Sequence, residues 1–142
     1  MKISERGINL IQSFEGFYPK EYACPSGYPT IGFGTVIKHG AYPEGVTKEQ
    51  ATGMMMAEIN RIERSVNRLI AVEINQNQFD ALCSFCYNLG SGALQASTLR
   101  SLINRGDFIA AAEEFPKWCH AGGRKLAGLV RRRWAEREMF LS

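Results

Sequence analysis

The chain has 142 residues, which is enough for one compact domain or for two lobes that share a core, but not for independent domains. Its composition, with 45% hydrophobic, 11% aromatic and 22% charged residues, excludes a disordered chain, a collagen-like repeat and a coiled coil. The net charge of +3 is too small to require a nucleic-acid partner, and we expect none. The charge is uneven, because residues 100–142 carry nine basic and five acidic side chains and residues 1–99 carry eight and nine.

The first predicted element is a helix over residues 4–14. Ser4 is suited to cap its N-terminus, and apolar residues recur at three-residue spacing on one face. Gly16 is expected to follow its last residue. From residue 17 to about 46, aromatic residues alternate with Pro, Ser and Gly, which predicts a small antiparallel sheet with tight turns.

Helix signals dominate the rest of the chain. Thr47-Lys48-Glu49-Gln50 has the form of a capping box, and apolar residues behind it step by three and four positions as far as Leu69. This pattern predicts a long amphipathic helix. Four further helices are expected: from a cap at Asn75 or Asn77 to Leu89, from Ser97 to Asn104, from Asp107 to Phe115, and from Lys125 to Leu141.

These elements together predict an α+β fold of two lobes with a cleft between them. We expect a small antiparallel sheet lobe over about residues 15–46 and a connecting helix over about 47–70. A larger helical lobe would cover about 71–142, with the N-terminal helix packed on it. The whole of 1–142 is expected to form a single domain.

Cysteines are the first candidate for special chemistry. Cys83-x-x-Cys86 with Cys119-His120 has the right residue types for a zinc site. Because Cys83 and Cys86 fall in register with apolar residues of a helix, we favour small buried hydrophobes and expect neither metal nor cofactor. Four cysteines are also too few for a disulfide scaffold, and no long apolar run follows the N-terminal basic residue. We therefore expect a protein that folds in a reducing cytoplasm without a membrane anchor.

The run Arg131-Arg132-Arg133 could bind phosphate or could cover the solvated face of a helix. We favour the solvated face, with Arg132 paired to Glu136 one turn later.

Glu15 is the candidate acid, at the expected end of the first helix between Phe14 and Gly16. A carboxyl group among apolar neighbours stays protonated to higher pH, because burial disfavours the charged form, and general acid catalysis needs a protonated group. Cys24 follows nine residues later and Thr30 six after that, and the intervening turns bring the sheet back toward the helix end. An acid on one side of a sugar bond, with groups that hold a water on the other, is the arrangement for glycoside hydrolysis.

The sequence resembles the phage lysozymes of glycoside hydrolase family 24, whose catalytic pattern E-x8-(D/C)-x5-T is matched by Glu15, Cys24 and Thr30. Three more stretches resemble the family's motifs and occur in the family's order: Thr30-Ile31-Gly32-Phe33-Gly34, then Asn88-Leu89-Gly90 followed by Ser97-Thr98-Leu99, then Gly128-Leu129-Val130 with Arg132, Arg133 and Glu136. The resemblance covers nearly the whole chain and agrees with the two-lobed fold predicted above.

The resemblance implies an endolysin that hydrolyses the β-1,4 bond between N-acetylmuramic acid and N-acetylglucosamine in peptidoglycan and so lyses the host cell. In that role Glu15 protonates the glycosidic oxygen, Cys24 and Thr30 position the attacking water, and Asn88 binds glycan in the cleft. The partner would be the glycan strand, met by a monomer that does not insert into the membrane. Such a protein waits folded in the host cytoplasm until a holin opens the membrane, and then acts in the periplasm.

Cys24 is a departure from the many relatives that have aspartate there. A thiol has a reference pKa of about 8.5, so it could orient water as a thiol or act as a thiolate base or nucleophile. Two alternatives to the muramidase stay open: a lytic transglycosylase, in which the 6-hydroxyl of the sugar replaces water, and a non-catalytic wall-binding protein of the same fold. The presence of both Cys24 and Thr30 favours hydrolysis.

Overall fold

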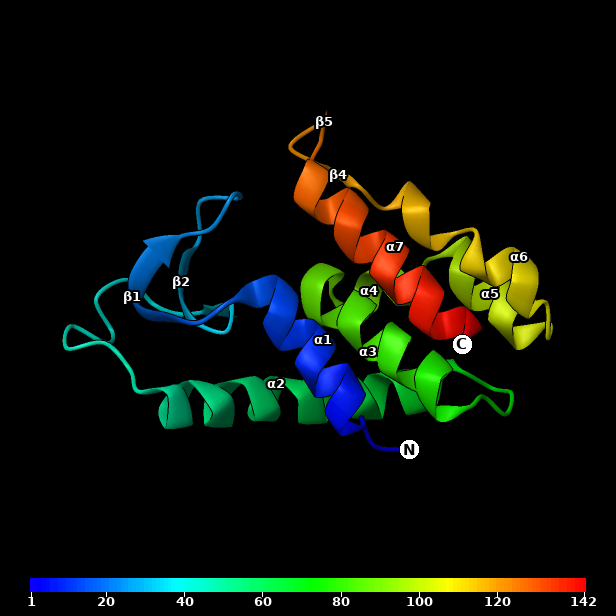
Figure 1. Ribbon diagram of the computed structural model, residues 1–142, viewed down its shortest axis with the longest axis horizontal. Helices are drawn as coiled ribbons and strands as arrows, with labels where there is room; N and C mark the ends of the chain where they lie inside the picture. The colour runs from blue at the N-terminus through cyan, green and yellow to red at the C-terminus, as the bar shows by residue number, and fades with distance from the viewer.

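The computed structural model describes residues 1–142 and confirms the predicted α+β fold, in which a small sheet lobe and a larger helical lobe flank a long helix (Figure 1). The elements are α1 (Glu5–Glu15), β1 (Tyr18–Ala23), β2 (Pro29–Gly32), β3 (Thr35–Val36), α2 (Lys48–Leu69), α3 (Gln76–Leu89), α4 (Ser91–Gln95), α5 (Thr98–Asn104), α6 (Phe108–Ala112), η1 (Phe115–Lys117), β4 (His120–Ala121), β5 (Arg124–Lys125) and α7 (Ala127–Leu141). None of the helices combines the length and the apolar character needed to cross a membrane.

The small lobe is an antiparallel sheet in the order β1-β2-β3, with Tyr22 of β1 opposite Thr30 of β2. Helix α2 runs beneath this sheet and continues under the helical lobe, so it belongs to both (Figure 1). Its start is the predicted capping box, in which Thr47 accepts the amide of Gln50 and the Gln50 side chain accepts the amide of Thr47.

Side-chain caps begin most of the long helices, as predicted. Ser4, Asn75 and Ser97 each accept an amide N–H from the first turn of the helix that follows, which settles the choice between Asn75 and Asn77. Asp107 makes no such bond, although it stands at the predicted position.

The predicted helix from Asp107 to Phe115 is too long. It ends at Ala112, and a 3-10 turn follows, because Pro116 has no amide hydrogen and restricts the residue before it. The helix predicted from Lys125 also begins later, at Ala127. In its place the chain first forms the β4-β5 hairpin, and the short helix α4 was likewise not predicted.

Two apolar clusters hold the fold together. The larger one surrounds α3 and includes aromatic side chains in contact, such as Phe85 and Phe115, whose rings meet edge to face. Cys83 and Cys86 are buried in it, which confirms that they pack as small hydrophobes. The smaller cluster lies under the sheet, where Ile11 of α1 joins residues of β2 and α2.

Helix α1 is fixed at its N-terminal end to α3 by the buried carboxylate of Asp80. Its Oδ1 accepts the amide of Ser4 at 3.0 Å and the side chain of Gln76 at 2.8 Å, and its Oδ2 accepts the Ser4 hydroxyl. Gly7 allows the helices to meet this closely, because a Cβ at residue 7 would lie 2.8 Å from the Asp80 carboxyl carbon. The contact fixes the direction in which α1 carries Glu15 at its other end.

Replacing Asp80 with Ala is therefore expected to destabilise the protein by about 3 kcal/mol, because Ser4 and Gln76 lose the buried, charged acceptor of their hydrogen bonds. Denaturant unfolding monitored by circular dichroism measures this. The control is Asn77→Ala on the same helix, whose exposed bond to Arg6 should be worth less than about 0.5 kcal/mol. Equal stability of the two variants would contradict this anchoring role.

Candidate active site

A groove lies between the two lobes and extends to both sides of Glu15. On one side is a cavity of about 340 Å³, and on the other a hollow of about 560 Å³. Six residues line both: Glu15, Tyr22, Pro25, Asn88, Leu126 and Leu129. A groove that passes the carboxylate on both sides has the shape needed for a linear polymer rather than for a small enclosed ligand.

Glu15 is the last residue of α1, and its side chain is only 17% exposed. Its Oε2 accepts a hydrogen bond from Nη1 of Arg132 at 2.6 Å, while Oε1 lies against Gly34. A Cβ at residue 34 would be 2.2 Å from Oε1, and the backbone φ there is +75°, so only glycine fits. The carboxylate is thus held in place by the last helix and by the turn after β2.

The surroundings of Glu15 differ from those predicted. The sequence predicts an apolar environment, but the partner of the carboxylate is the guanidinium of Arg132, 117 residues away in the chain. The predicted solvated face for the arginine run is also wrong for two of its three members. Arg132 is 4% exposed and Arg133 is fully buried, whereas Arg131 is exposed.

Glu136 is the reason why both arginines can be buried. Its carboxylate is 2.8 Å from Nε of Arg133 and 3.3 Å from Nε of Arg132, so the predicted pair one turn apart does form. The Ser84 hydroxyl donates to the same carboxylate at 2.5 Å. Burial raises the pKa of Glu136, and the two guanidinium groups and the hydroxyl act against that effect. With Glu15 ionised, the cluster has two positive and two negative charges.

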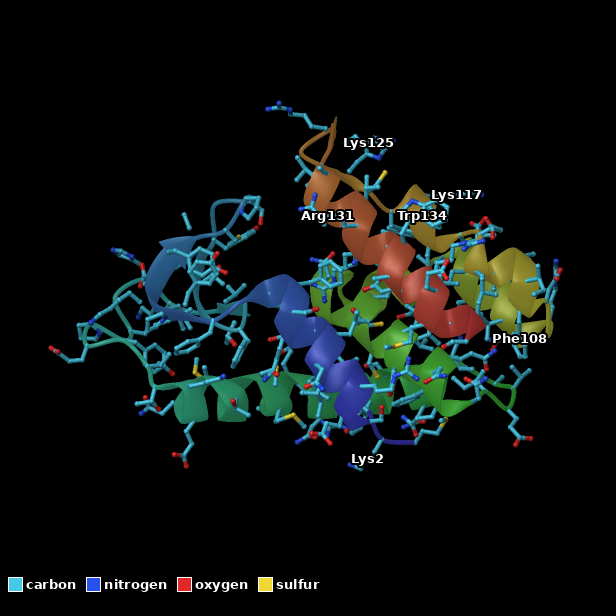
Figure 2. All side chains as sticks on the ribbon, in the orientation of Figure 1. Lys2, Phe108, Lys117, Lys125, Arg131 and Trp134 are labelled. Atoms are coloured by element: carbon cyan, nitrogen blue, oxygen red, sulfur yellow. The ribbon has the colours of Figure 1, made fainter.

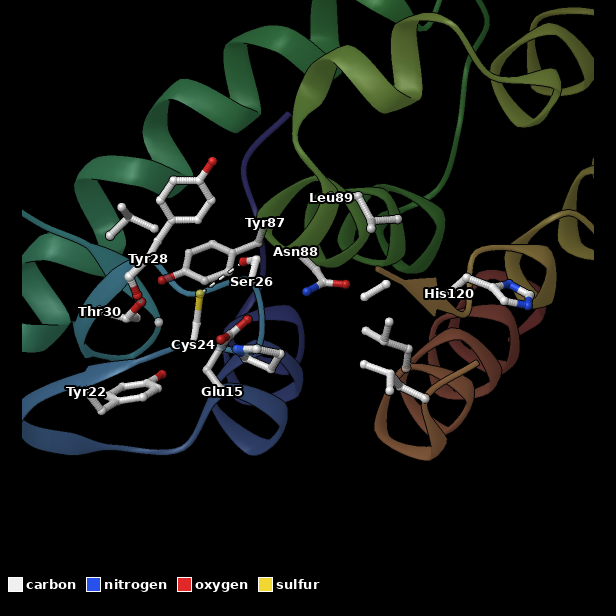
Figure 3. Close-up of a pocket in the computed structure, with 16 residues that line it drawn as sticks. Glu15, Tyr22, Cys24, Ser26, Tyr28, Thr30, Tyr87, Asn88, Leu89 and His120 are labelled. Atoms are coloured by element: carbon white, nitrogen blue, oxygen red, sulfur yellow. Dashed lines mark hydrogen bonds between the residues drawn. The ribbon is translucent and has the colours of Figure 1, made fainter. Parts of the chain in front are cut away.

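Asn88 lies at the end of α3 and faces the groove. Its Oδ1 accepts a hydrogen bond from Nη2 of Arg133 at 2.8 Å, which fixes the orientation of the amide. The amide nitrogen therefore points away from Arg133, and Figure 3 shows it on the side that faces Glu15. The arginine run thus orients two residues of the groove, with Arg132 holding Glu15 and Arg133 holding Asn88.

Cys24 and Thr30 lie on the sheet lobe, on the same groove as Glu15, so the structure brings the three residues together (Figure 3). The Cys24 sulfur is 3.1 Å from the Ser26 hydroxyl. The hydroxyl of Ser26, with smaller contributions from the Thr30 side chain and the backbone of Ser26 and Tyr28, lowers the pKa of Cys24 to about 7, against the opposing effect of burial. The hydroxyl of the buried Thr30 donates to the carbonyl of Tyr28 at 2.8 Å, which leaves its oxygen as an acceptor.

Tyr22 and Tyr87 also line the groove, although the sequence analysis did not single them out. Burial and the nearby Glu15 carboxylate raise the pKa of Tyr22, so its phenol stays a hydrogen-bond donor. Tyr87 is held by a bond from its hydroxyl to the carbonyl of Phe33 at 2.5 Å. Their signal in the sequence was weak, because Tyr22 is one of several aromatic residues in a turn-rich region and Tyr87 is a single aromatic residue in a helix, and both patterns also occur in ordinary cores. Gly34 and Glu136 entered the sequence analysis only as members of stretches that resemble the family's motifs, or as the partner of Arg132, without a role in the site.

The structure brings together a carboxylic acid on the helical side of the groove and a thiol with a hydroxyl on the sheet side. Such a pair of faces can protonate a leaving oxygen and bind a water opposite to it. No group of three or more His, Cys, Asp or Glu side chains is arranged to hold a metal ion.

The fold and this groove define a two-lobed protein of the lysozyme class. The structure is similar to that of the endolysin from Escherichia coli O157:H7 phage FAHEc1, with a TM-score of 0.88 and 35% sequence identity. The match covers 100% of this chain and 94% of that one. The chain belongs to the phage lysozyme family, whose model matches residues 12–136.

Several sequence relatives carry the name endolysin. That of Salmonella phage P22 is 36% identical over 100% of this chain and 99% of its own length. That of Bacillus phage B103 is 44% identical over 100% of this chain but only 55% of its own length. The chain therefore spans little more than half of the Bacillus phage relative.

The low pKa of Cys24 predicts how its thiol reacts. Because the thiolate is the reactive form, alkylation by iodoacetamide should accelerate with pH, with a midpoint near 7, and level off above pH 8. Ser26→Ala should move the midpoint upward, since the Ser26 bond is the largest lowering effect. In Cys24→Ser only slow labelling should remain, because the other three cysteines are buried. A wild-type rate that still rises tenfold per pH unit above 8 would contradict this.

Proposed function

We propose that the protein is an endolysin that hydrolyses the β-1,4 bond between N-acetylmuramic acid and N-acetylglucosamine in peptidoglycan. The observation that carries the proposal is the position of Glu15 in a groove that extends into a hollow on each side of it, with Cys24 and Thr30 lining one of the two. Family membership supports it, as do the relatives named endolysin.

Glu15 is the general acid of this reaction. Arg132 occupies Oε2, so the proton is carried on Oε1, the oxygen beside Gly34. From there it passes to the glycosidic oxygen as the bond to the muramic acid breaks. The hydrogen bond from Arg132 to Oε2 keeps the carboxyl group in one orientation, which removes the entropic cost of aligning it during the reaction.

Cys24 and Thr30 hold the attacking water on the opposite face of the sugar. The free lone pairs of the Thr30 hydroxyl accept one hydrogen from water. The Cys24 thiol, with a pKa of about 7, is substantially ionised at neutral pH and accepts the other. Water attacking from that side leads to inversion at the anomeric carbon.

Asn88 binds glycan with the amide nitrogen that its bond to Arg133 leaves free. A fixed donor beside Glu15 suits a carbonyl or hydroxyl oxygen of an N-acetylated sugar. Tyr22 provides a second donor from the sheet side.

The proposal also places the protein in the cell. It folds in the host cytoplasm, depends on a holin to cross the membrane, and acts as a monomer on the wall from the periplasm. The chain's 45% hydrophobic content lies mainly in two packed clusters, which supports a protein that needs no membrane insertion.

Replacing Glu15 with Gln should reduce the rate of peptidoglycan hydrolysis by about 10²–10⁴, because the amide cannot deliver a proton. Release of reducing ends from purified peptidoglycan measures this. Glu5→Gln is the matched control, since it makes the same change at the exposed first turn of the same helix and should keep the parent rate.

Thermal unfolding of both variants shows whether each is folded under the assay conditions. A folded Glu15→Gln protein with near-normal activity would remove Glu15 from the role of general acid.

A further inference from the structure

One hydrogen bond joins the sheet lobe directly to the helical lobe. The Tyr87 hydroxyl on α3 donates to the carbonyl of Phe33 at 2.5 Å, and no other hydrogen bond or ion pair connects residues 17–46 with residues 71–142. Lys125 and Arg131, at the start of α7, lie away from the sheet lobe (Figure 2). The ring of Tyr87 also packs against both apolar clusters. Tyr87 is therefore the direct polar link between the two lobes.

The acceptor of this bond lies in the turn that meets Glu15. Phe33 stands between Gly32 and Gly34, whose φ angles are +68° and +75°. On one side the turn packs on α2, because a Cβ at Gly32 would lie 2.9 Å from the Cβ of Ala51. On the other side Gly34 lies against Oε1 of Glu15. The bond from α3 thus fixes the same turn that bounds the carboxyl group.

The phenol of Tyr87 is suited to this contact, because it keeps its proton. Burial, together with the nearby Glu15 carboxylate, raises the pKa of Tyr87, so the hydroxyl remains a donor at neutral pH. The Thr35 side chain acts against this rise, which places it beside the phenol, and its buried hydroxyl has no hydrogen-bond partner. The phenol oxygen can accept from Thr35 while it donates to Phe33. Both groups that face the phenol belong to the sheet lobe.

We propose that Tyr87 is a positioning residue for Glu15: its bond to Phe33 holds the turn so that Gly34 stays against Oε1. The inference rests on the proposed function, because it takes Oε1 to be the oxygen that delivers the proton. Tyr87 acts through the turn rather than on the reacting atoms. A displacement of about 1 Å can cost about 10²-fold in rate, so a bond that fixes this turn affects the chemical step.

The first test is Tyr87→Phe, which removes the phenol oxygen and keeps the ring in both apolar clusters. We expect kcat to fall about tenfold, between the ~5-fold worth of one neutral hydrogen bond and the ~10²-fold cost of a misplaced group. KM should change by less than about twofold, because the change acts on the chemical step. Release of reducing ends from soluble glycan strands gives both constants, and thermal unfolding shows that the variant is folded.

A second measurement follows the carboxyl group without any substrate. The carboxyl carbon resonance of Glu15 is recorded by NMR and assigned by its loss in Glu15→Gln. In Tyr87→Phe this resonance should shift, because Gly34 no longer holds its place against Oε1. The carbonyl carbon of Phe33 should shift as well, since it loses its hydrogen bond.

Tyr42→Phe is the matched control. It removes a phenol oxygen from an exposed tyrosine that follows β3 and lines neither hollow beside Glu15. This variant should keep the parent kcat and KM and leave the Glu15 resonance in place.

Three results would overturn the proposal: a kcat within twofold of the parent, a rise in KM at constant kcat, or a fall in kcat with an unmoved Glu15 resonance. The second would make Tyr87 a substrate-binding residue, and the third would separate it from Glu15. If Glu15→Gln kept its activity, the proposed function of Glu15 would be rejected. The two NMR shifts would still show whether Tyr87 positions the carboxyl group, so the two failures are distinguishable.

Discussion

The ion pair between Glu15 and Arg132 is the interaction on which the rest of the site depends. It joins the end of the first helix to the last helix, and it determines where the carboxylate meets the groove. Buried ion pairs are stable only when their remaining donors and acceptors are satisfied. Here Glu136 and Ser84 meet that requirement for Arg132, and Arg133 joins the same cluster and extends it to Asn88. A single buried carboxylate at Glu136 thus supports both polar groups on the helical side of the groove.

The sheet side of the groove is organised differently from the helical side. The sheet side contributes no carboxylate to either hollow beside Glu15, and Cys24 lies there instead. The short turns around Cys24 supply hydrogen-bond donors that lower the pKa of its thiol to about 7. The thiol is therefore partly ionised at neutral pH without a cationic neighbour. The two lobes therefore supply two kinds of group: a carboxyl group fixed by arginine, and a thiol with a hydroxyl fixed by turns, which the proposed mechanism uses as the acid and as the pair that holds water. The groove between them extends past Glu15 into the two hollows.

The sequence predicted the elements that depend on local signals. The caps at Ser4, Thr47 and Ser97 were identified, and that of α3 was narrowed to Asn75 or Asn77, because capping is decided within four residues. The β4-β5 hairpin was missed because its strands are two residues long and carry no alternating pattern. The burial of Arg132 and Arg133 could not be predicted from their neighbours in the chain, because a solvated and a buried arginine run have the same local sequence pattern. What buries them are partners far away in the chain, Glu15, Ser84 and Asn88, whose positions only the fold determines. The motif positions of the candidate site did locate Glu15, Cys24, Thr30 and Asn88 on one groove.

The central claim is that water, held opposite Glu15 by the sheet lobe, attacks the sugar. The most direct test is to digest purified peptidoglycan with the reduced protein and to determine the masses of the released muropeptides. Hydrolysis predicts fragments that have gained one water and end in a reducing N-acetylmuramic acid. Fragments lighter by one water, with a 1,6-anhydro ring, would identify a lytic transglycosylase and contradict the roles given to Cys24 and Thr30. If the folded protein released no fragments at all, the groove would be a binding site only, and the account of catalysis would be wrong.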